Sequence, residues 1–130
     1  MMSIAKLEHV NVTVSNPERT AEMLCELFGW HIRWQGDSAL GGRTVHVGRD
    51  NSYLALYTQT RTASSNGSSY AMRGGLNHIG VVVDNLDEAE QRVLGAGFET
   101  HNHADYEPGR RFYFNDHDGI EFEVVHYPES

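Results

Sequence analysis

The chain has 130 residues, which is the size of one domain or of two small modules that share a core. Its hydrophobic content of 39% and its charged content of 22% are those of a folded globular protein and argue against a disordered chain. The formal net charge of −8, with Lys and Arg scattered along the sequence, argues against nucleic acid or an anionic membrane as the main partner and favours a small molecule.

The first predicted element is a strand over residues 7–14. One alternate set of its positions is aliphatic, while His9 lies among polar residues on the opposite face, and this period of two is typical of a half-buried strand. A helix should follow, with Asn16 as its N-cap, Pro17 at its first position and Gly29 at its end. Apolar residues recur along it with helical spacing, which predicts one amphipathic helix.

Three further strands complete the first predicted module, which spans residues 4–59. They are expected over 30–35, 43–47 and 52–59, because turn residues such as Gly and Asp separate these runs. Residues 60–74 are polar and rich in Ser and Gly, which predicts a linker or mobile loop rather than a packed element.

The second module, residues 75–127, repeats the order of the first. Residues 76–83 match residues 7–14 at an offset of 69, and His78 takes the place of His9. The elements that follow are a helix over 86–96, capped by Asp84 or Asn85 and ended by Gly97, and strands near 98–103, 111–115 and 120–126. This repeat predicts an α+β fold of two βαβββ modules whose sheets together enclose one concave site.

The sequence also suggests where the protein resides. No run approaches the roughly 20 apolar residues that cross a bilayer, and the first residues lack the basic and apolar pattern of a secretory signal. Cys25 is the single cysteine and cannot form an internal disulfide. We therefore expect a cytoplasmic protein.

Three phrases carry a resemblance to a known family: Leu7-Glu8-His9-Val10, Leu76-Asn77-His78-Ile79-Gly80 and the run from Phe114 to Glu123. In this order and spacing the chain resembles, over nearly its whole length, the vicinal oxygen chelate superfamily. That superfamily includes glyoxalase, extradiol dioxygenases, fosfomycin-resistance transferases and bleomycin-binding proteins. The resemblance implies that the two modules form a paired-sheet, half-open barrel, and members of the family commonly form homodimers.

The same resemblance implies a metal site. In the family the ligands lie on the first and last strands of each module, and the last-strand glutamate follows a turn glycine by four residues. Carried over to this sequence, the pattern gives His9, His78 and Glu123 as ligands, with Gly119 as the turn glycine. The turn departs from the family pattern at His117, where proline is usual.

The fourth ligand position of the family falls on a residue that cannot bind a metal. The internal repeat places Ala55 where the second module has Glu123, although a different register would bring Gln59 there. Glu121 shares a face with Glu123 and is the alternative carboxylate ligand. Loss of the fourth ligand argues against plain glyoxalase chemistry.

Two imidazoles and one carboxylate with open positions resemble the ligands of non-haem Fe(II) oxygenases, although Mn, Zn, Ni and Co also accept such ligands. A bound divalent ion would polarise a carbonyl or lower the pKa of a bound water or substrate hydroxyl. Tyr57, Arg111 and Tyr113 lie on strands expected to line the cleft and are the candidate catalytic residues. The Arg111 guanidinium could meet an anionic substrate group or lie in solvent.

Three functions remain open at this point. The first is a metal-dependent enzyme that acts on a small oxygen-chelating substrate, in the manner of a dioxygenase or a fosfomycin transferase. The second is a glyoxalase-like lyase or isomerase in which water or Gln59 replaces the fourth ligand. The third is a metal-free, drug-sequestering protein. The presence of both histidines favours an enzyme, whose site could lie within one chain or be shared between the chains of a dimer.

Overall fold

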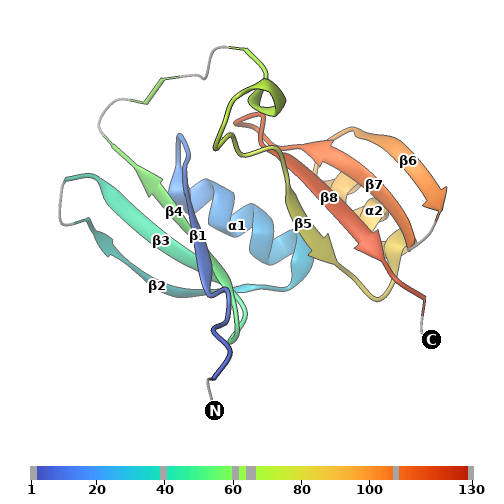
Figure 1. Cartoon of the computed structure of the whole chain (residues 1–130), viewed down its shortest axis with the longest axis horizontal. Helices are drawn as coiled ribbons and strands as arrows, with labels where there is room; N and C mark the ends of the chain where they lie inside the picture. Colours follow the sequence, from blue (N-terminus) through green and yellow to red (C-terminus); the bar gives the residue numbers. More distant parts are fainter. Residues whose placement is uncertain (1–2, 39–40, 60–61, 64–66, 107–108, 129–130) are drawn as a thin grey trace. The chain divides into compact units, whose positions relative to one another are not determined.

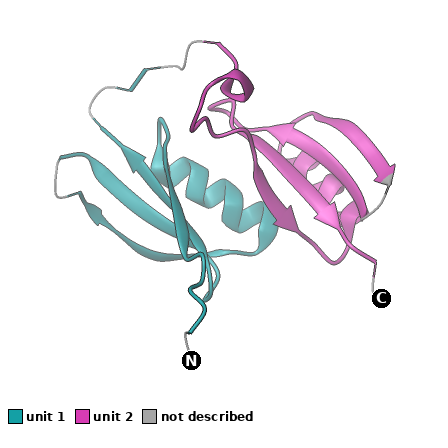
Figure 2. Cartoon of the chain, viewed as in Figure 1, with its two compact units in different colours: residues 1–63 teal, residues 64–130 magenta. Residues whose placement is uncertain are grey.

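The computed structural model describes residues 3–38, 41–59, 62–63, 67–106 and 109–128. The chain divides into two compact units, Met1–Ala63 and Ser64–Ser130 (Figure 2). The division falls inside the segment 60–74 that separates the two predicted modules. In the parts of the chain that the structure describes, no helix is long and apolar enough to span a membrane.

Each unit is a four-stranded sheet with one α-helix, in the predicted order (Figure 1). The first unit contains β1 (His9–Thr13), α1 (Pro17–Phe28), β2 (His31–Asp37), β3 (Arg43–Gly48) and β4 (Tyr53–Thr58), with strand order β1-β4-β3-β2. The second contains β5 (Ile79–Val82), α2 (Leu86–Gly95), β6 (Thr100–Tyr106), β7 (Gly109–Asn115) and β8 (Glu121–His126), with strand order β5-β8-β7-β6. The α+β class and the two βαβββ modules are therefore confirmed.

In both units the first strand pairs in parallel with the last, and the other strands pair antiparallel. The register places Asn11 opposite Ala55 in the first sheet and Gly80 opposite Glu123 in the second. Asn11 and Gly80 are equivalent in the internal repeat, so Ala55 and Glu123 occupy equivalent places. The register therefore supports Ala55 at the fourth ligand position, and Gln59 lies beyond the end of β4.

The helix boundaries follow from local hydrogen bonding. The Asn16 side chain accepts a bond from the Arg19 amide, and α1 ends at Gly29, whose φ of 71° is a left-handed conformation that glycine adopts readily. In α2 the cap is Asn85, which accepts from the Glu88 amide, and this settles the choice between Asp84 and Asn85.

The core of each unit lies between its helix and the facing side of its sheet. In the second unit, Phe112, Phe114 and Phe122 are fully buried, and the last two stack with ring centroids 5.1 Å apart. Burial of each such side chain contributes about 1.5–3 kcal/mol. The first unit buries Val45, Val47, Leu54 and Leu56 against α1. The opposite face of each sheet carries polar and aromatic side chains together with a few aliphatic ones such as Ala55 and Val125.

The described part of residues 60–74 contains one short helical turn, none of whose residues is buried. Residues 60, 61 and 64–66 lie outside the described residues, but Ser69–Ala71 form a short 3-10 helix, η1. The Ser68 side chain caps η1 by accepting a hydrogen bond from the Tyr70 amide. The Ser-rich composition concealed this turn, because serine is also a good helix cap.

Several predicted strands are shifted by a few residues. β6 covers 100–106 instead of 98–103, because the Phe98 amide still bonds the Val93 carbonyl at the end of α2. β5 begins one residue after His78, so this histidine directly precedes its strand. The alternation within β1 is also less complete than expected, since Val10 is exposed to 40%.

Asp116 is a buried carboxyl group in the turn before β8. Its side chain is 6% exposed, and its Oδ1 accepts bonds from the amides of Asp118 and Ile120 at 2.9 Å. Among the residues described, its Oδ2 has no hydrogen-bond partner. Burial outweighs the two amide bonds and raises the pKa of Asp116.

We therefore expect stability to fall as pH rises through the interval between the unfolded and the raised folded pKa of Asp116, because the folded state binds the proton more tightly there. Asp116→Asn keeps the Oδ1 acceptor and removes the charge, so its stability relative to wild type should improve from pH 3 to pH 7 in urea unfolding. Exposed Asp84→Asn is the control. A pH-independent difference between Asp116→Asn and wild type would contradict the expectation.

Candidate functional site

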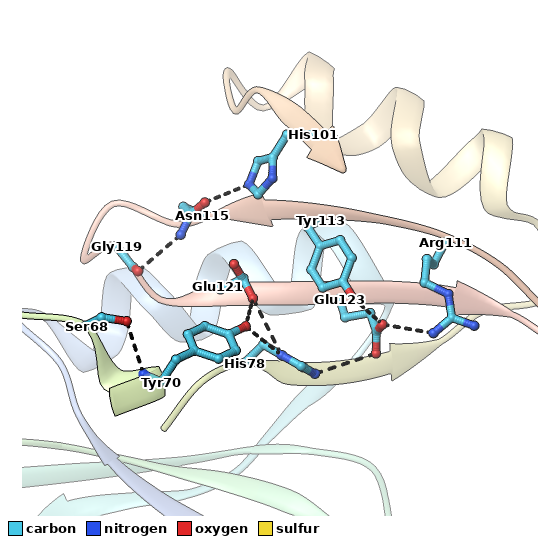
Figure 3. A network of polar contacts seen from close by, with 10 residues as sticks. All are labelled: Ser68, Tyr70, His78, His101, Arg111, Tyr113, Asn115, Gly119, Glu121 and Glu123. Carbon is cyan, nitrogen blue, oxygen red and sulfur yellow. Dashed lines mark hydrogen bonds and ion pairs between the residues drawn. The ribbon is translucent and has the colours of Figure 1, made fainter. Parts of the chain in front are cut away.

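A polar network covers the face of the second sheet that α2 does not cover (Figure 3). Side chains alternate along β7 and β8, so Tyr113 and Glu123 share this face, while Phe112 and Val124 enter the core. Parallel pairing of β5 with β8 brings His78, which directly precedes β5, beside the glutamates of β8. His78 therefore lies on this face together with Glu121 and Glu123 of β8.

Glu123 is held through one of its two oxygens. The Tyr113 hydroxyl donates to Glu123 Oε2 at 2.6 Å, and Arg111 Nη1 donates to the same oxygen at 3.1 Å. The side chains of Arg111 and Glu123 are only 11% and 15% exposed. Burial raises the pKa of Glu123, but the bonds from Tyr113 and Arg111 outweigh it, so the net pKa is lowered. Arg111 is therefore no solvated strand arginine, and it stabilises the charge of Glu123.

The second oxygen of Glu123 faces the His78 ring. Glu123 Oε1 lies 3.7 Å from His78 Nε2, which is longer than a hydrogen bond. Gly80 is the strand neighbour of Glu123, and a Cβ at Gly80 would lie 3.9 Å from this oxygen. Because residue 80 is glycine, it has no side chain that could cover the side of Glu123 Oε1 facing β5.

The other ring nitrogen of His78 is surrounded by oxygens. His78 Nδ1 lies 3.3 Å from the Tyr70 hydroxyl and 3.5 Å from Glu121 Oε1. The Tyr70 hydroxyl in turn donates to Glu121 Oε1 at 2.7 Å. The ring edge contacts Tyr113, with centroids 5.8 Å apart. Tyr70 thus joins the site from η1, and sequence reasoning missed it.

These contacts test whether the residues fit a divalent ion. A divalent ion binds imidazole nitrogen and carboxylate oxygen at about 2.0–2.2 Å. His78 Nε2 and Glu123 Oε1 are 3.7 Å apart, so one ion placed between them could contact both atoms. Neighbouring groups hold the other nitrogen and the other oxygen, as is common for metal ligands. The pair therefore fits such an ion. Within the described residues, however, no group of three or more His, Cys, Asp or Glu side chains forms a metal-binding cluster.

His9, the third predicted ligand, lies in the first unit, and its participation in one site with His78 and Glu123 stays a prediction. Its ring stacks on Tyr53 with centroids 4.9 Å apart, and its Nδ1 lies 2.8 Å from Glu8 Oε1. The Tyr53 hydroxyl donates to the same glutamate oxygen at 3.3 Å. Both predicted ligand histidines thus direct Nδ1 toward a glutamate that also accepts from a tyrosine.

Aromatic rings continue across the first sheet on the face that carries His9. His46 stacks on Tyr53 with centroids 4.7 Å apart, and Trp34, which is 50% exposed, contacts His46. The Arg33 guanidinium lies 4.3 Å from the Tyr53 ring centroid. Burial, with the nearby charges of His9 and Arg33, lowers the pKa of His46. Sequence reasoning missed this array, although the alternation along β3 and β4 could have placed His46 and Tyr53 on one face.

The remaining candidates have different surroundings. Tyr57 shares the face of Tyr53, and its hydroxyl donates to the Gly41 carbonyl at 3.2 Å. His101, which sequence reasoning also missed, stacks on Tyr113 and lies 2.8 Å from Asn115 Oδ1 through its Nε2. The structure therefore brings Arg111 and Tyr113 to Glu123 and leaves Tyr57 in the first unit.

Solved structures with the same fold are numerous. A glyoxylase/bleomycin resistance protein/dioxygenase domain from Frankia sp. EAN1pec matches 97% of this chain and 100% of its own, with a TM-score of 0.80 and 21% identity. TnmS3, an antibiotic binding protein from Streptomyces sp. CB03234, matches 98% of this chain and 100% of its own, with a TM-score of 0.76 and 19% identity.

A variant of FosX, a fosfomycin resistance protein from Listeria monocytogenes, matches in its complex with Mn(II) and 1S,2S-dihydroxypropylphosphonic acid. The match covers 95% of this chain and 93% of that chain, with a TM-score of 0.72 and 20% identity. At these identities the three similarities establish the fold.

Comparison with curated protein sequences gave no significant match. The comparison with protein families matches residues 6–124, which is most of the chain. The repeated modules, the paired first and last strands and this match agree: the chain belongs to the Glyoxalase/Bleomycin resistance protein/Dioxygenase superfamily.

Proposed function

We propose that the chain is a metal-dependent enzyme that acts on a small oxygen-chelating substrate through His9, His78 and Glu123. The observation that carries this proposal is the arrangement of His78 Nε2 and Glu123 Oε1, which face each other at 3.7 Å while neighbours hold their other polar atoms. The similarity to FosX, whose variant was bound to Mn(II) and a dihydroxy phosphonic acid, supports a metal-dependent reaction on a small oxygen-bearing substrate, and a fosfomycin-transferase-like reaction is one form of this proposal. A dioxygenase-like reaction is the other form of this proposal, and the metal is Fe, Mn, Zn, Ni or Co.

The roles of the residues follow from their contacts. A bound divalent ion would supply Lewis acidity toward a carbonyl, a water or a substrate hydroxyl. Arg111 and Tyr113 keep Glu123 ionised and fix its Oε2. Because Arg111 is bound to Glu123, we assign it to holding this carboxylate rather than to binding an anionic group of the substrate.

The proposal is tested by metal analysis of protein purified without chelators. We expect near one divalent ion per chain, or saturable binding when Mn, Fe, Zn, Ni or Co is added to stripped protein. If the purified protein contains no metal and binds none of these ions when they are added, the proposal is overturned. Turnover of fosfomycin, oxygen uptake with catechols and turnover of glutathione hemithioacetals then separate transferase, dioxygenase and glyoxalase-like chemistry.

The glyoxalase-like lyase or isomerase is disfavoured by Ala55, which stands where the second unit has Glu123. A metal-free, antibiotic-binding function is the second candidate, because the ring array of His9, Tyr53, His46 and Trp34 offers a stacking surface. The similarity to TnmS3 favours it too. Quenching of tryptophan fluorescence by an aromatic antibiotic in the presence of a strong chelator would separate this function from the enzyme.

We also propose a cytoplasmic homodimer. Mixed dimers of His9→Ala and His78→Ala chains decide whether the site is shared. If His9 of one chain meets His78 and Glu123 of the other, the mixed dimer regains one intact site and binds metal. If the site lies within one chain, every site in the mixture lacks a histidine, and no binding returns.

A further inference from the structure

We propose that Tyr70 and Glu121 form a positioning pair that fixes the tautomer and orientation of His78, so that Nε2 is the atom directed toward the metal. This inference rests on the proposed metal site and adds to it two residues that bind no metal themselves. It concerns only the second unit, where all of the groups involved lie together (Figure 3).

The argument begins with the single proton of the Tyr70 hydroxyl. That proton is donated to Glu121 Oε1, which lies 2.7 Å away, so the phenol oxygen presents only lone pairs to His78 Nδ1 at 3.3 Å. Glu121 Oε1, at 3.5 Å from Nδ1, is also an acceptor. Both neighbours of Nδ1 therefore accept, and the Tyr70 oxygen is within hydrogen-bond distance. The acceptor that faces Nε2, Glu123 Oε1, is farther away at 3.7 Å, so the contacts favour a neutral His78 ring with its proton on Nδ1. Nε2 then has a free lone pair on the side of Glu123.

The backbone around Tyr70 is built to hold this hydroxyl in place. Ser68 caps η1, and the Gly75 amide bonds the Met72 carbonyl at 3.0 Å to close the turn. A Cβ at Gly75 would lie 2.4 Å from the Ser69 carbonyl oxygen, so this close approach requires glycine. Tyr70 itself is 63% exposed, and its ring is not a core contact that would explain such a closed turn.

The first unit contains a related arrangement built from different positions. His9 Nδ1 lies 2.8 Å from Glu8 Oε1, and the Tyr53 hydroxyl donates to that oxygen at 3.3 Å. Here the tyrosine lies on the last strand and the glutamate beside the histidine, whereas in the second unit the glutamate lies on the last strand. In both units, therefore, Nδ1 of the candidate ligand faces a glutamate that accepts from a tyrosine, although the positions are not equivalent in the repeat.

The pair predicts an unusual double-mutant cycle for metal affinity. In Glu121→Ala the Tyr70 proton is released and can be donated to His78 Nδ1, which moves the ring proton to Nε2. We expect this variant to bind Mn(II) or Zn(II) about 10–100-fold more weakly, as for other partners of metal ligands. Tyr70→Phe alone should weaken binding by a smaller factor, because Glu121 still accepts from Nδ1. Adding Tyr70→Phe to Glu121→Ala should strengthen binding, because the unwanted donor is removed.

The measurements are calorimetric titration of each variant with Mn(II) or Zn(II) and nitrogen NMR of the metal-free proteins. NMR should show His78 protonated on Nδ1 in wild type and on Nε2 in Glu121→Ala. Tyr127→Phe, which removes another exposed tyrosine hydroxyl of the same unit, is the matched control and should change neither result.

If Tyr70→Phe weakens metal binding by the same factor in wild type and in Glu121→Ala, the two effects are additive and the positioning role is overturned. Glu121 would then act by direct ligation or by simple packing. An unchanged tautomer in Glu121→Ala would overturn it as well. If the wild-type protein binds no metal, the proposed function fails, while the NMR of the metal-free protein still decides whether Tyr70 and Glu121 set the tautomer.

Discussion

Replacement of His78 by alanine should abolish tight metal binding and leave the second unit folded. The His78 side chain is 34% exposed and lies on the open face of the sheet, so its removal creates no core cavity. Mutation of a residue that hydrogen-bonds to a metal ligand typically lowers metal affinity about 10–100-fold. Loss of the ligand itself should lower the affinity by more than this. Calorimetric titration with Mn(II) and Zn(II) measures the affinity, and thermal unfolding of the metal-free protein checks the fold.

His103→Ala is the matched control for this experiment. His103 belongs to the same unit, but it contacts Phe112 and the Glu90 side chain of α2, and its Nε2 lies 2.5 Å from Glu90 Oε2. Metal affinity should be unchanged in this variant, with a small loss of stability from the broken contact. Equal affinities of His78→Ala and wild type would remove His78 from the metal site and leave the family fold without the proposed chemistry.

The largest effect on stability is expected from Phe114→Ala. Phe114 is 0% exposed, stacks on Phe122 and contacts Phe98, so truncation leaves a cavity in the middle of the second core. Such changes cost about 3–5 kcal/mol, which is a large share of the roughly 5–15 kcal/mol by which a domain is stable. The midpoint of urea unfolding, followed by circular dichroism, should fall strongly.

Leu94→Ala serves as the control for that truncation. Leu94 is 45% exposed on α2, and substitutions of exposed residues usually change the free energy of unfolding by no more than about 0.5 kcal/mol.

The neighbour of Phe114 in the sequence is Tyr113, which holds Glu123 on the opposite face. Phe114→Ala should therefore also weaken metal binding. If Phe114→Ala were as stable as wild type, the face of the sheet that carries Phe114 would not be the core.

The fold was predictable because it depends on periodicity and on an internal repeat. Alternation by two marks strands whose faces differ, and the offset of 69 identified His78 as the counterpart of His9. Glu123 came instead from the resemblance to the family, four residues after Gly119. The same repeat gave the register of Ala55, which the structure supports. These features are encoded locally and repeated, so two copies of a weak pattern reinforce each other.

The surroundings of these residues were not predictable from the same patterns. Tyr70 lies in a Ser-rich stretch with no apolar period, and only the closed turn brings its hydroxyl to Glu121. Arg111 could be assigned to solvent or to a substrate, because one sequence does not reveal that β7 and β8 align it with Glu123. Contacts of this kind depend on rotamers and on pairs far apart in the chain, which composition and spacing do not specify.

Parallel pairing of β5 with β8 also determines when the site can form. Glu123 reaches the side of His78 only after the intervening α2, β6 and β7 have closed into a loop, and closing a long loop costs conformational entropy that later contacts must offset. We therefore expect the two donors to meet late in folding. A nascent chain that stops before β8 carries His78 without its carboxylate, so the proposed metal would bind to this sheet only after the unit is complete.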